Sequence, residues 1–154
     1  MSDCITRGEI DAARKRLDGY AVKTPLMRHP ALDAATGGTI LIKPECLQRT
    51  GSFKFRGAFN RLSQIPESDR SRGVVACSSG NHAQGVAESA RILGIPATIV
   101  MPKNAPTIKL RRTREFGAKV ITYDRATEDR EAIAANLCKQ SGATFVHPFN
   151  DPQI

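Results

Sequence analysis

The chain has 154 residues, of which 40% are hydrophobic and 25% are charged. This composition is typical of one globular domain with a buried core, and it excludes a disordered chain. The longest strongly apolar stretch without a charge, residues 92–102, has 11 residues, about half the length that a membrane-spanning helix needs. The first residues lack an apolar segment, so we expect no signal peptide.

The net charge of +8 raises the question of nucleic-acid binding. Most lysines and arginines are interleaved with acidic residues, and the one cluster consists of Lys109, Arg111, Arg112 and Arg114. Phe116 is the one aromatic residue near this cluster, whereas single-strand binders place aromatic platforms along a basic groove. A solvated helix face, or attraction for small acidic substrates, explains the charge more simply. We predict neither a nucleic-acid nor a membrane partner, and nucleic-acid binding remains the alternative.

The four cysteines are widely spaced, at Cys4, Cys46, Cys77 and Cys138. The sequence has no C-x-x-C pair, so it supports neither a zinc site nor a redox motif. Scattered cysteines in a chain that can bury a core are typical of free thiols in the cytosol. We expect a cytoplasmic protein without a metal ion, with Cys77 in the core because it ends an apolar run.

The first 70 residues are less regular than the rest. Residues 8–17 favour a helix, and residues 24–27 favour an extended segment because a residue before proline avoids the helical region. Residues 39–43 predict a strand after a glycine pair. A second helix is expected from about residue 52, since one helical face is formed by Phe55, Ala58, Phe59 and Leu62.

From residue 73 onward, strands and helices alternate. Apolar runs predict strands at residues 74–77, 97–101, 119–123 and 143–146. Helices are expected over residues 82–93, from Pro106 to Gly117, and from a Thr127 cap to Gly142 with Glu128 and Asp129 in its first turn. Strands that alternate with helices at this spacing form βαβ units. We therefore predict an α/β fold in which a parallel sheet carries helices on both faces.

The segment GSFKFRGA at residues 51–58 places a lysine where a helix disfavours one. Lys54 falls in the first turn, and the start of a helix already carries partial positive charge. The same field favours the neutral amine that a nucleophilic or Schiff-base lysine requires. Gly57 and Ala58 leave room beside its stem. The alternative, the commoner one for these residues alone, is a surface lysine whose ammonium reaches water.

The loop CSSGNHAQG at residues 77–85 is rich in polar side chains: Ser78, Ser79, Asn81 and His82. Free N–H groups at a helix start, together with hydroxyls, form an anion site. Ligands of parallel sheets also gather at the carboxyl ends of strands, where this loop lies. The alternative is an ordinary N-cap made by one serine or Asn81, although the loop offers more polar groups than a cap needs. His82 alone fits a hydrogen-bonded structural residue better than a ligand.

Together these segments resemble the threonine/serine dehydratase and serine racemase family, which are pyridoxal-phosphate enzymes of the tryptophan-synthase-β fold type. Residues 51–58 are similar to the family's cofactor-lysine motif, and SSGNHAQG at residues 78–85 is similar to its substrate-carboxylate loop. Further agreement is found in KPE at 43–45, LQRT at 47–50 and HPFNDP at 147–152. The resemblance runs from about residue 6 to the last residue, and the residues around the lysine differ from those of the related cysteine synthases.

The resemblance implies a role for each matching residue. Lys54 forms the covalent Schiff base with pyridoxal 5′-phosphate and, once substrate displaces it, takes the α-proton. Phe53 packs against the pyridine ring, and Asn81 hydrogen-bonds the cofactor's 3′-oxygen. The substrate carboxylate is surrounded by Ser78, Ser79, Asn81 and His82. Ser79 also serves as a second acid–base group on the opposite face, as in family members that racemise serine.

The implied reaction is β-elimination from L-threonine or L-serine. Loss of the α-proton gives a carbanion that the cofactor stabilises, the β-hydroxyl leaves, and the released enamine hydrolyses to a 2-oxo acid and ammonia. Serine racemisation, and amino-acid binding without chemistry, are the alternatives. The implied partners are a small amino-acid substrate and, in the full-length form, further copies of the chain.

Family members are about twice as long as this chain, so we expect it to be the N-terminal half of such an enzyme. The glycine-rich loop for the cofactor phosphate, the residue facing the pyridine nitrogen and the acidic residues that bind a divalent cation in some members normally follow. We expect residues 1–47 to belong to the larger cofactor domain, residues 48–146 to form a small open α/β domain, and residues 147–154 to return to the larger one. The isolated chain should bind the cofactor weakly, have little activity and expose apolar surface.

Overall fold

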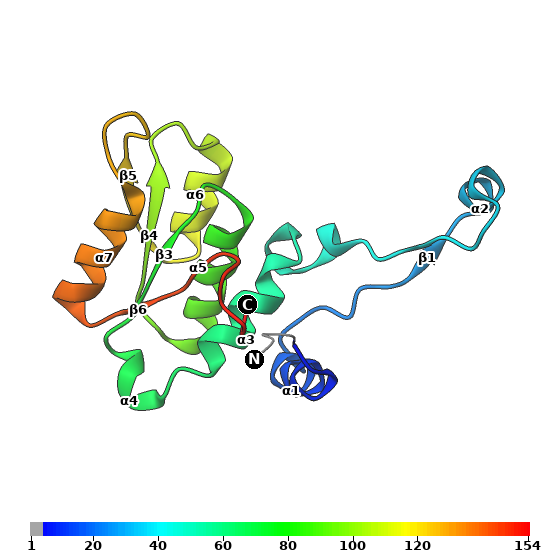
Figure 1. The fold of residues 1–154 in the computed structure, drawn as a ribbon, viewed down its shortest axis with the longest axis horizontal. Coiled ribbons are helices and arrows are strands. Elements are labelled where there is room, and N and C mark those ends of the chain that lie inside the picture. Colours follow the sequence, from blue (N-terminus) through cyan, green and yellow to red (C-terminus); the bar gives the residue numbers. More distant parts are fainter. Residues whose placement is uncertain (1–4) are drawn as a thin grey trace.

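Strand β3 (Val74–Cys77) is buried along its whole length and lies inside the sheet (Figure 1). A computed structural model describes residues 5–154. Strand β3 pairs in parallel with β4 (Ala97–Pro102) on one side and with β6 (Thr144–Phe145) on the other. Strand β5 (Lys119–Tyr123) extends the sheet beyond β4, also in parallel, in the order β5-β4-β3-β6. The predicted α/β class with a parallel sheet is confirmed.

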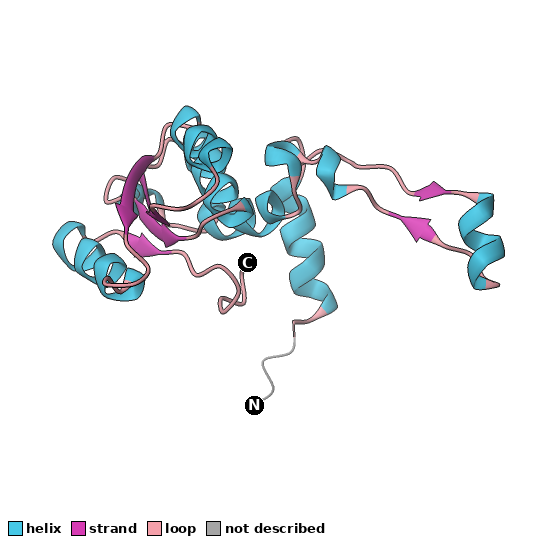
Figure 2. Ribbon diagram, turned by 90° about the horizontal axis from the view of Figure 1, so that it is seen from above, coloured by secondary structure: helices cyan, strands magenta, loops and turns pink. Residues whose placement is uncertain are grey.

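Helices cover both faces of this sheet, as predicted (Figure 2). Helices α5 (Asn81–Leu93) and α6 (Thr107–Glu115) lie on one face, and α7 (Arg130–Ser141) lies on the other. Because side chains alternate along a strand, β3 contributes side chains to the hydrophobic cores on both faces of the sheet. Ala76 packs among residues of α5, and Cys77 packs with residues of α7. The apolar runs at β3 and β4 therefore become strands that are largely buried from both sides.

Helix α7 is capped by Asp129, so the predicted cap at Thr127 is wrong. The Asp129 carboxylate accepts hydrogen bonds from the backbone N–H groups of Glu131 (2.8 Å) and Ala132 (3.4 Å). Thr127 instead belongs to a turn, in which its N–H donates to the carbonyl of Asp124. Threonine and aspartate both cap helices well. Because Thr127 lies in this turn, Asp129 caps α7 instead.

Helix α3 (Lys54–Ser63) packs against α5 through the predicted face of Phe55, Ala58, Phe59 and Leu62, all of which are buried. The two backbones approach closely at Gly85, where an added Cβ would lie 3.0 Å from the carbonyl oxygen of Lys54. Helix α1 (Arg7–Leu17) lies against α3, and Arg16 donates a 2.9 Å hydrogen bond to Asn60 across this contact. Helix α3 is thus held between α5 and α1.

An arm projects from the body between α1 and α3 (Figure 1). It consists of β1 (Met27–Arg28), α2 (Pro30–Thr36) and β2 (Leu41–Ile42), and the two strands pair in antiparallel fashion. The strand predicted at residues 39–43 is therefore only two residues long, and α2 was not predicted. Its large apolar side chains, Leu26, Met27, Leu41 and Ile42, are exposed, which agrees with the expectation of uncovered apolar surface.

The remaining elements are short. Two 3-10 turns, Glu45–Leu47 and Arg49–Gly51, lead into α3, and α4 (Glu67–Arg70) joins α3 to β3. Cys46, Cys77 and Cys138 are free thiols, whereas Cys4 lies outside the described residues. Across residues 5–154 every helix is too short or too polar to cross a bilayer. The division at residues 47/48 and 146/147 stays a proposal.

Candidate active site

The candidate site forms where the strand order reverses. From β3 the chain moves outward to β4 and β5, and then returns through α7 to place β6 on the other side of β3. Such a reversal, at the carboxyl ends of parallel strands, is where α/β sheets bind ligands. The chain that leaves β6, residues 146–148, contacts side chains of both predicted motifs.

Lys54 lies in the first turn of α3, as predicted; it is the first residue of this helix, and its side chain is half-buried. Its Nζ donates a 2.6 Å hydrogen bond to the carbonyl oxygen of Pro148 and lies 5.4 Å from the centre of the Phe53 ring. The amine therefore faces the turn that follows β6 and does not extend freely into solvent. The aromatic ring of Phe53, itself exposed, offers a flat apolar surface beside that amine.

His82 lies in the first turn of α5 and is 4% exposed. Its Nε2 is 3.2 Å from the carbonyl oxygen of Val146, and its Nδ1 has no partner in the described part of the chain. Burial, with smaller contributions from the charges of Lys54 and His147, lowers the pKa of His82 to about 4. The ring is thus neutral at pH 7, with Nε2–H donating and the lone pair of Nδ1 left to accept.

The turn between β3 and α5 leaves the start of α5 open. Within residues 5–154 no side chain caps this helix; the Ser78 hydroxyl instead accepts a 3.2 Å hydrogen bond from the Gly80 N–H. A Cβ added at Gly80 would meet no atom within 4 Å, so a ligand has room to approach the backbone there. The ordinary N-cap considered for this loop is not formed, and the first N–H groups of α5 can bind an anion.

Three helix starts around the turn share a charge pattern. Helices α3, α5 and α6 have no acidic residue in the first turn, whereas α1, α2, α4 and α7 each have at least one. An acidic residue normally offsets the partial positive charge of a helix start. Lys54 in α3 and Lys109 in α6 add cations instead, and Lys109 reaches the side chain of Asn81 at 2.6 Å. This convergence of positive charge favours an anionic ligand.

The backbone before Lys54 is strained. Thr50 adopts a left-handed conformation, with φ of 62°, and Gly51 follows with φ of 71°. That conformation is costly for a β-branched residue, so the surrounding contacts must hold the turn. The hydroxyl groups of Thr50 and Ser52 are buried and lack partners among the described residues. The two hydroxyls add unfilled hydrogen-bonding capacity next to the lysine.

An ion-pair clamp anchors the same helix start. Arg56 donates to both carboxylate oxygens of Glu45, at 2.7 and 2.8 Å, and the Thr24 hydroxyl donates to Glu45 at 2.6 Å. These hydrogen bonds, those from Arg56 above all, lower the pKa of Glu45 to about 2. Arg56 is two residues beyond Lys54, so the clamp ties the first turn of α3 to the segment that precedes it.

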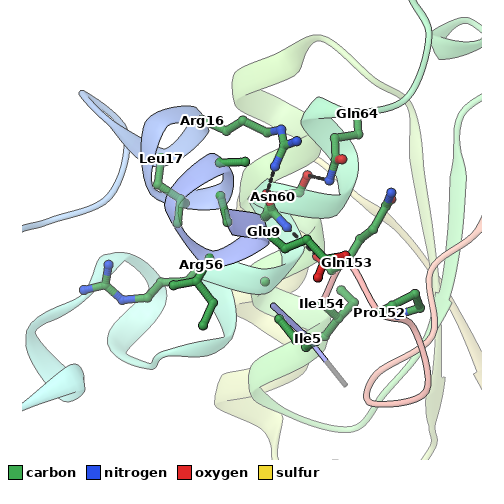
Figure 3. Close-up of a pocket in the computed structure, with 14 residues that line it drawn as sticks. Ile5, Glu9, Arg16, Leu17, Arg56, Asn60, Gln64, Pro152, Gln153 and Ile154 are labelled. Atoms are coloured by element: carbon green, nitrogen blue, oxygen red, sulfur yellow. Dashed lines mark hydrogen bonds between the residues drawn. The ribbon is translucent and has the colours of Figure 1, made fainter. Parts of the chain in front are cut away.

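Two cavities lie near this region without containing Lys54. One of about 290 Å³ lies between α1, α3 and the last residues, and Figure 3 shows Arg16, Asn60 and Gln153 around it. Its floor is close-packed, because a Cβ at Gly57 would lie 2.6 Å from the backbone of Ile154. The other, of about 320 Å³, lies beside α7 and is lined by Cys77, Cys138 and Pro148, among others.

Comparison with known proteins identifies the class. Residues 17–154 match the family described as pyridoxal-phosphate dependent enzymes, and the chain belongs to this family. The cofactor that the resemblance implied, pyridoxal phosphate, is thereby confirmed as the cofactor of the family.

Among the curated relatives are ammonia-lyases and a serine racemase. The chain is 54% identical to an L-threo-3-hydroxyaspartate ammonia-lyase of Pseudomonas, over 95% of this chain and 46% of the relative. It is 48% identical to the L-threonine ammonia-lyase of Thermotoga maritima, over 97% and 37%, and 42% identical to the serine racemase of Schizosaccharomyces pombe, over 100% and 49%. The chain therefore spans less than half the length of these relatives.

Solved structures show the same fold. The serine racemase of Dictyostelium discoideum superposes with a TM-score of 0.91 at 35% identity, covering 97% of this chain and 48% of that one. The maize serine racemase superposes with a TM-score of 0.91 at 38% identity, covering 95% and 44%. The predicted tryptophan-synthase-β type of fold, present here in part, is confirmed.

The residues present fit this cofactor on the protein side. A half-buried primary amine, a flat aromatic ring beside it, an open helix start and an unpartnered buried acceptor on His82 lie around one turn. The structure brings together Lys54, Phe53 and His82, and it places Ser78, Ser79 and Asn81 in the adjoining turn. Sequence reasoning missed the Pro148 carbonyl and the contact of Lys109. The contact of Lys109 could have been suspected from the sequence, because Lys109, like Lys54, is a cation in the first turn of a helix.

Proposed function

We propose that the protein carrying this chain deaminates 3-hydroxy α-amino acids by eliminating water and hydrolysing the resulting enamine, with L-threonine and L-serine as the first candidates. The observation that carries this proposal is the Lys54 amine, held beside the uncapped start of α5. An amine and an anion site around one turn suit a substrate that presents an α-carbon next to a carboxylate.

Pyridoxal phosphate, when bound, supplies an electron sink for the α-carbon. The chain supplies the other requirements. The N–H groups at the start of α5, with the hydroxyls of Ser78 and Ser79 and the amide of Asn81, bind the substrate carboxylate. Lys54 removes the α-proton once its amine is free. His82 stays neutral and holds the chain after β6 in place.

The net reaction balances without an oxidant or reductant. The α-proton and the β-hydroxyl leave as water, and hydrolysis of the resulting enamine takes up one water and releases ammonia. L-threonine thus gives 2-oxobutyrate and L-serine gives pyruvate. L-threo-3-hydroxyaspartate carries the same reacting groups, and the 54% identity with a lyase named for it adds this substrate to the candidates.

Serine racemisation is the second candidate. Ser79 carries a hydroxyl in the carboxylate turn, and 42% identity with a serine racemase covers the whole chain. Racemisation requires a second acid–base group on the face opposite Lys54, and we assign that role to Ser79. Ser79→Ala then removes racemisation while leaving elimination, and loss of both activities together counts against this second role.

The experiment uses the protein at its natural length, whether that is this chain or a longer one. Added pyridoxal phosphate should produce a visible absorbance band that Lys54→Ala abolishes. Ammonia and 2-oxo acid are then measured with L-threonine, L-serine and L-threo-3-hydroxyaspartate, alongside chiral analysis of serine. If the protein binds these amino acids but never shows the absorbance band with pyridoxal phosphate, it is a non-catalytic binding protein, and the proposal is overturned.

A further inference from the structure

Asn81 has a neighbour that fixes the direction of its amide. Its Oδ1 accepts a 2.6 Å hydrogen bond from Nζ of Lys109, which comes from α6 and lies 28 residues further along the chain. An ammonium group has three donors and no acceptor. Only the oxygen of an amide can face it, so the usual ambiguity between the two ends of an asparagine side chain is removed.

The backbone of Lys109 is anchored within α6. Thr113, four residues further on, is fully buried, and its hydroxyl donates to the Lys109 carbonyl at 2.8 Å; α6 itself packs on α5. Residues four apart lie on one helical face, so the stem of Lys109 leaves α6 on the side that packs on α5. Arg111 points elsewhere and pairs with Glu115 at 3.4 Å. Within the basic cluster the contact with the candidate site belongs to Lys109.

The fixed amide presents donors to the turn. With Oδ1 held by Lys109, the Nδ2 group carries two N–H donors and no lone pair to offer, so it selects an oxygen acceptor. The ammonium also polarises the amide, because hydrogen bonds in a chain strengthen one another. A donor of this kind binds an anionic oxygen more strongly than a neutral one. A lysine in the first turn of a helix, otherwise unfavourable, is then stabilised by that anion.

We propose that Lys109 is a positioning residue, which orients the Asn81 amide toward the anionic oxygen of the bound cofactor. This inference rests on the proposed function and on the contact between Asn81 and the cofactor's 3′-oxygen that the family resemblance implies. Lys109 itself touches neither substrate nor cofactor. It acts through the direction and the strength of one side-chain amide.

The test compares Lys109→Met, Lys109→Arg and Asn81→Ala in the natural-length protein, with Lys103→Met as the control for loss of one exposed positive charge. The first readout is cofactor affinity, which should weaken about tenfold in Lys109→Met, the size of one charge-assisted hydrogen bond. The arginine variant keeps a charged donor and should restore most of this affinity. Asn81→Ala should weaken binding at least as much, and combining it with Lys109→Met should add little.

The second readout is the pH midpoint of the bound cofactor's visible band. Removing a cation and an oriented donor both favour the protonated form, so Lys109→Met should move the midpoint upward by about 0.5–1 unit. A residue that only supports the fold would leave this midpoint in place. The side-chain amide of Asn81, followed by NMR and assigned by its loss in Asn81→Ala, should shift in Lys109→Met and stay unchanged in Lys103→Met.

Each outcome separates the inference from the proposed function. Unchanged affinity and midpoint in Lys109→Met, with both altered in Asn81→Ala, would overturn the role of Lys109 alone. A band that Asn81→Ala does not affect but Lys54→Ala abolishes would also overturn the inference and leave the proposed function standing. A band that persists in Lys54→Ala would remove the proposed function and the inference together.

Discussion

The clamp between Glu45 and Arg56 gives the most quantitative prediction, because it joins the chain before the candidate site to the helix that carries Lys54. Its carboxylate accepts three hydrogen bonds, of 2.7, 2.8 and 2.6 Å. The side chains of Glu45 and Arg56 are only 19% and 31% exposed. The perturbation is Glu45→Gln, which keeps the shape and removes the charge.

The magnitude follows from the lowered pKa of Glu45. A fall from 4.5 to about 2 corresponds to roughly 3 kcal/mol between the charged and the neutral carboxyl. Partial exposure of both side chains and the hydrogen bonds that glutamine retains reduce this value. We expect Glu45→Gln to lower the free energy of unfolding by about 2 kcal/mol at pH 7.

Urea unfolding, followed by circular dichroism, measures this change. In a double-mutant cycle with Arg56→Met, the coupling energy should account for most of the roughly 2 kcal/mol estimated above. The matched control is Asp11→Asn, because the Arg7–Asp11 pair has side chains that are 84% and 48% exposed; its effect should stay below about 0.5 kcal/mol.

The pH dependence supplies a second check. Because the folded pKa of Glu45 is depressed, its stabilisation is fully present above the unfolded value of about 4.5 and is lost as the pH falls toward about 2. The difference between wild type and Glu45→Gln should therefore shrink over that window. A coupling below about 0.5 kcal/mol, or a difference that does not change from about pH 5 to about 2, would refute the reasoning.

Two further predictions concern α5. The pKa of His82 is lowered to about 4, so NMR of its ring protons should show a neutral ring down to about pH 5. The free energy of unfolding should fall from about pH 6.5 toward pH 4, because the unfolded chain takes up the proton first. A His82 ring that titrates near pH 6.5 would contradict this. Gly85→Ala, whose new Cβ would meet the Lys54 carbonyl at 3.0 Å, should cost about 1–3 kcal/mol in urea unfolding. Gly38→Ala, with no atom within 4 Å, is its control, and equal effects of the two would argue against the close approach of α3 and α5.

The sequence predicted the sheet better than the arm for a physical reason. Strands β3 and β4 are largely buried from both sides, so continuous apolar runs mark them with little ambiguity. The arm at residues 22–44 buries little, so its strands and α2 leave a weak pattern. The sequence offers both Thr127 and Asp129 as caps for α7. The structure uses Asp129, because Thr127 lies in a local turn.

The site was predictable where motifs are local and unpredictable where it depends on distant contacts. The position of Lys54 at a helix start and the polar turn at residues 78–82 follow from their own segments. The carbonyl of Pro148, 94 residues from Lys54, has no side-chain signature in the sequence. The contact of Lys109 with Asn81 needs the packing of α6 on α5, which periodicity alone does not specify.

The pairing of β6 with β3 sets an order of events for the newly made chain. Lys54 and His82 both find their oxygen partners just beyond β6, near the last residues of this sequence. Contacts between segments this far apart in the chain form late, since the intervening chain must first be ordered. While the ribosome is still making β6, Lys54 has no carbonyl to hold it, so its amine reaches the observed position only as the fold closes.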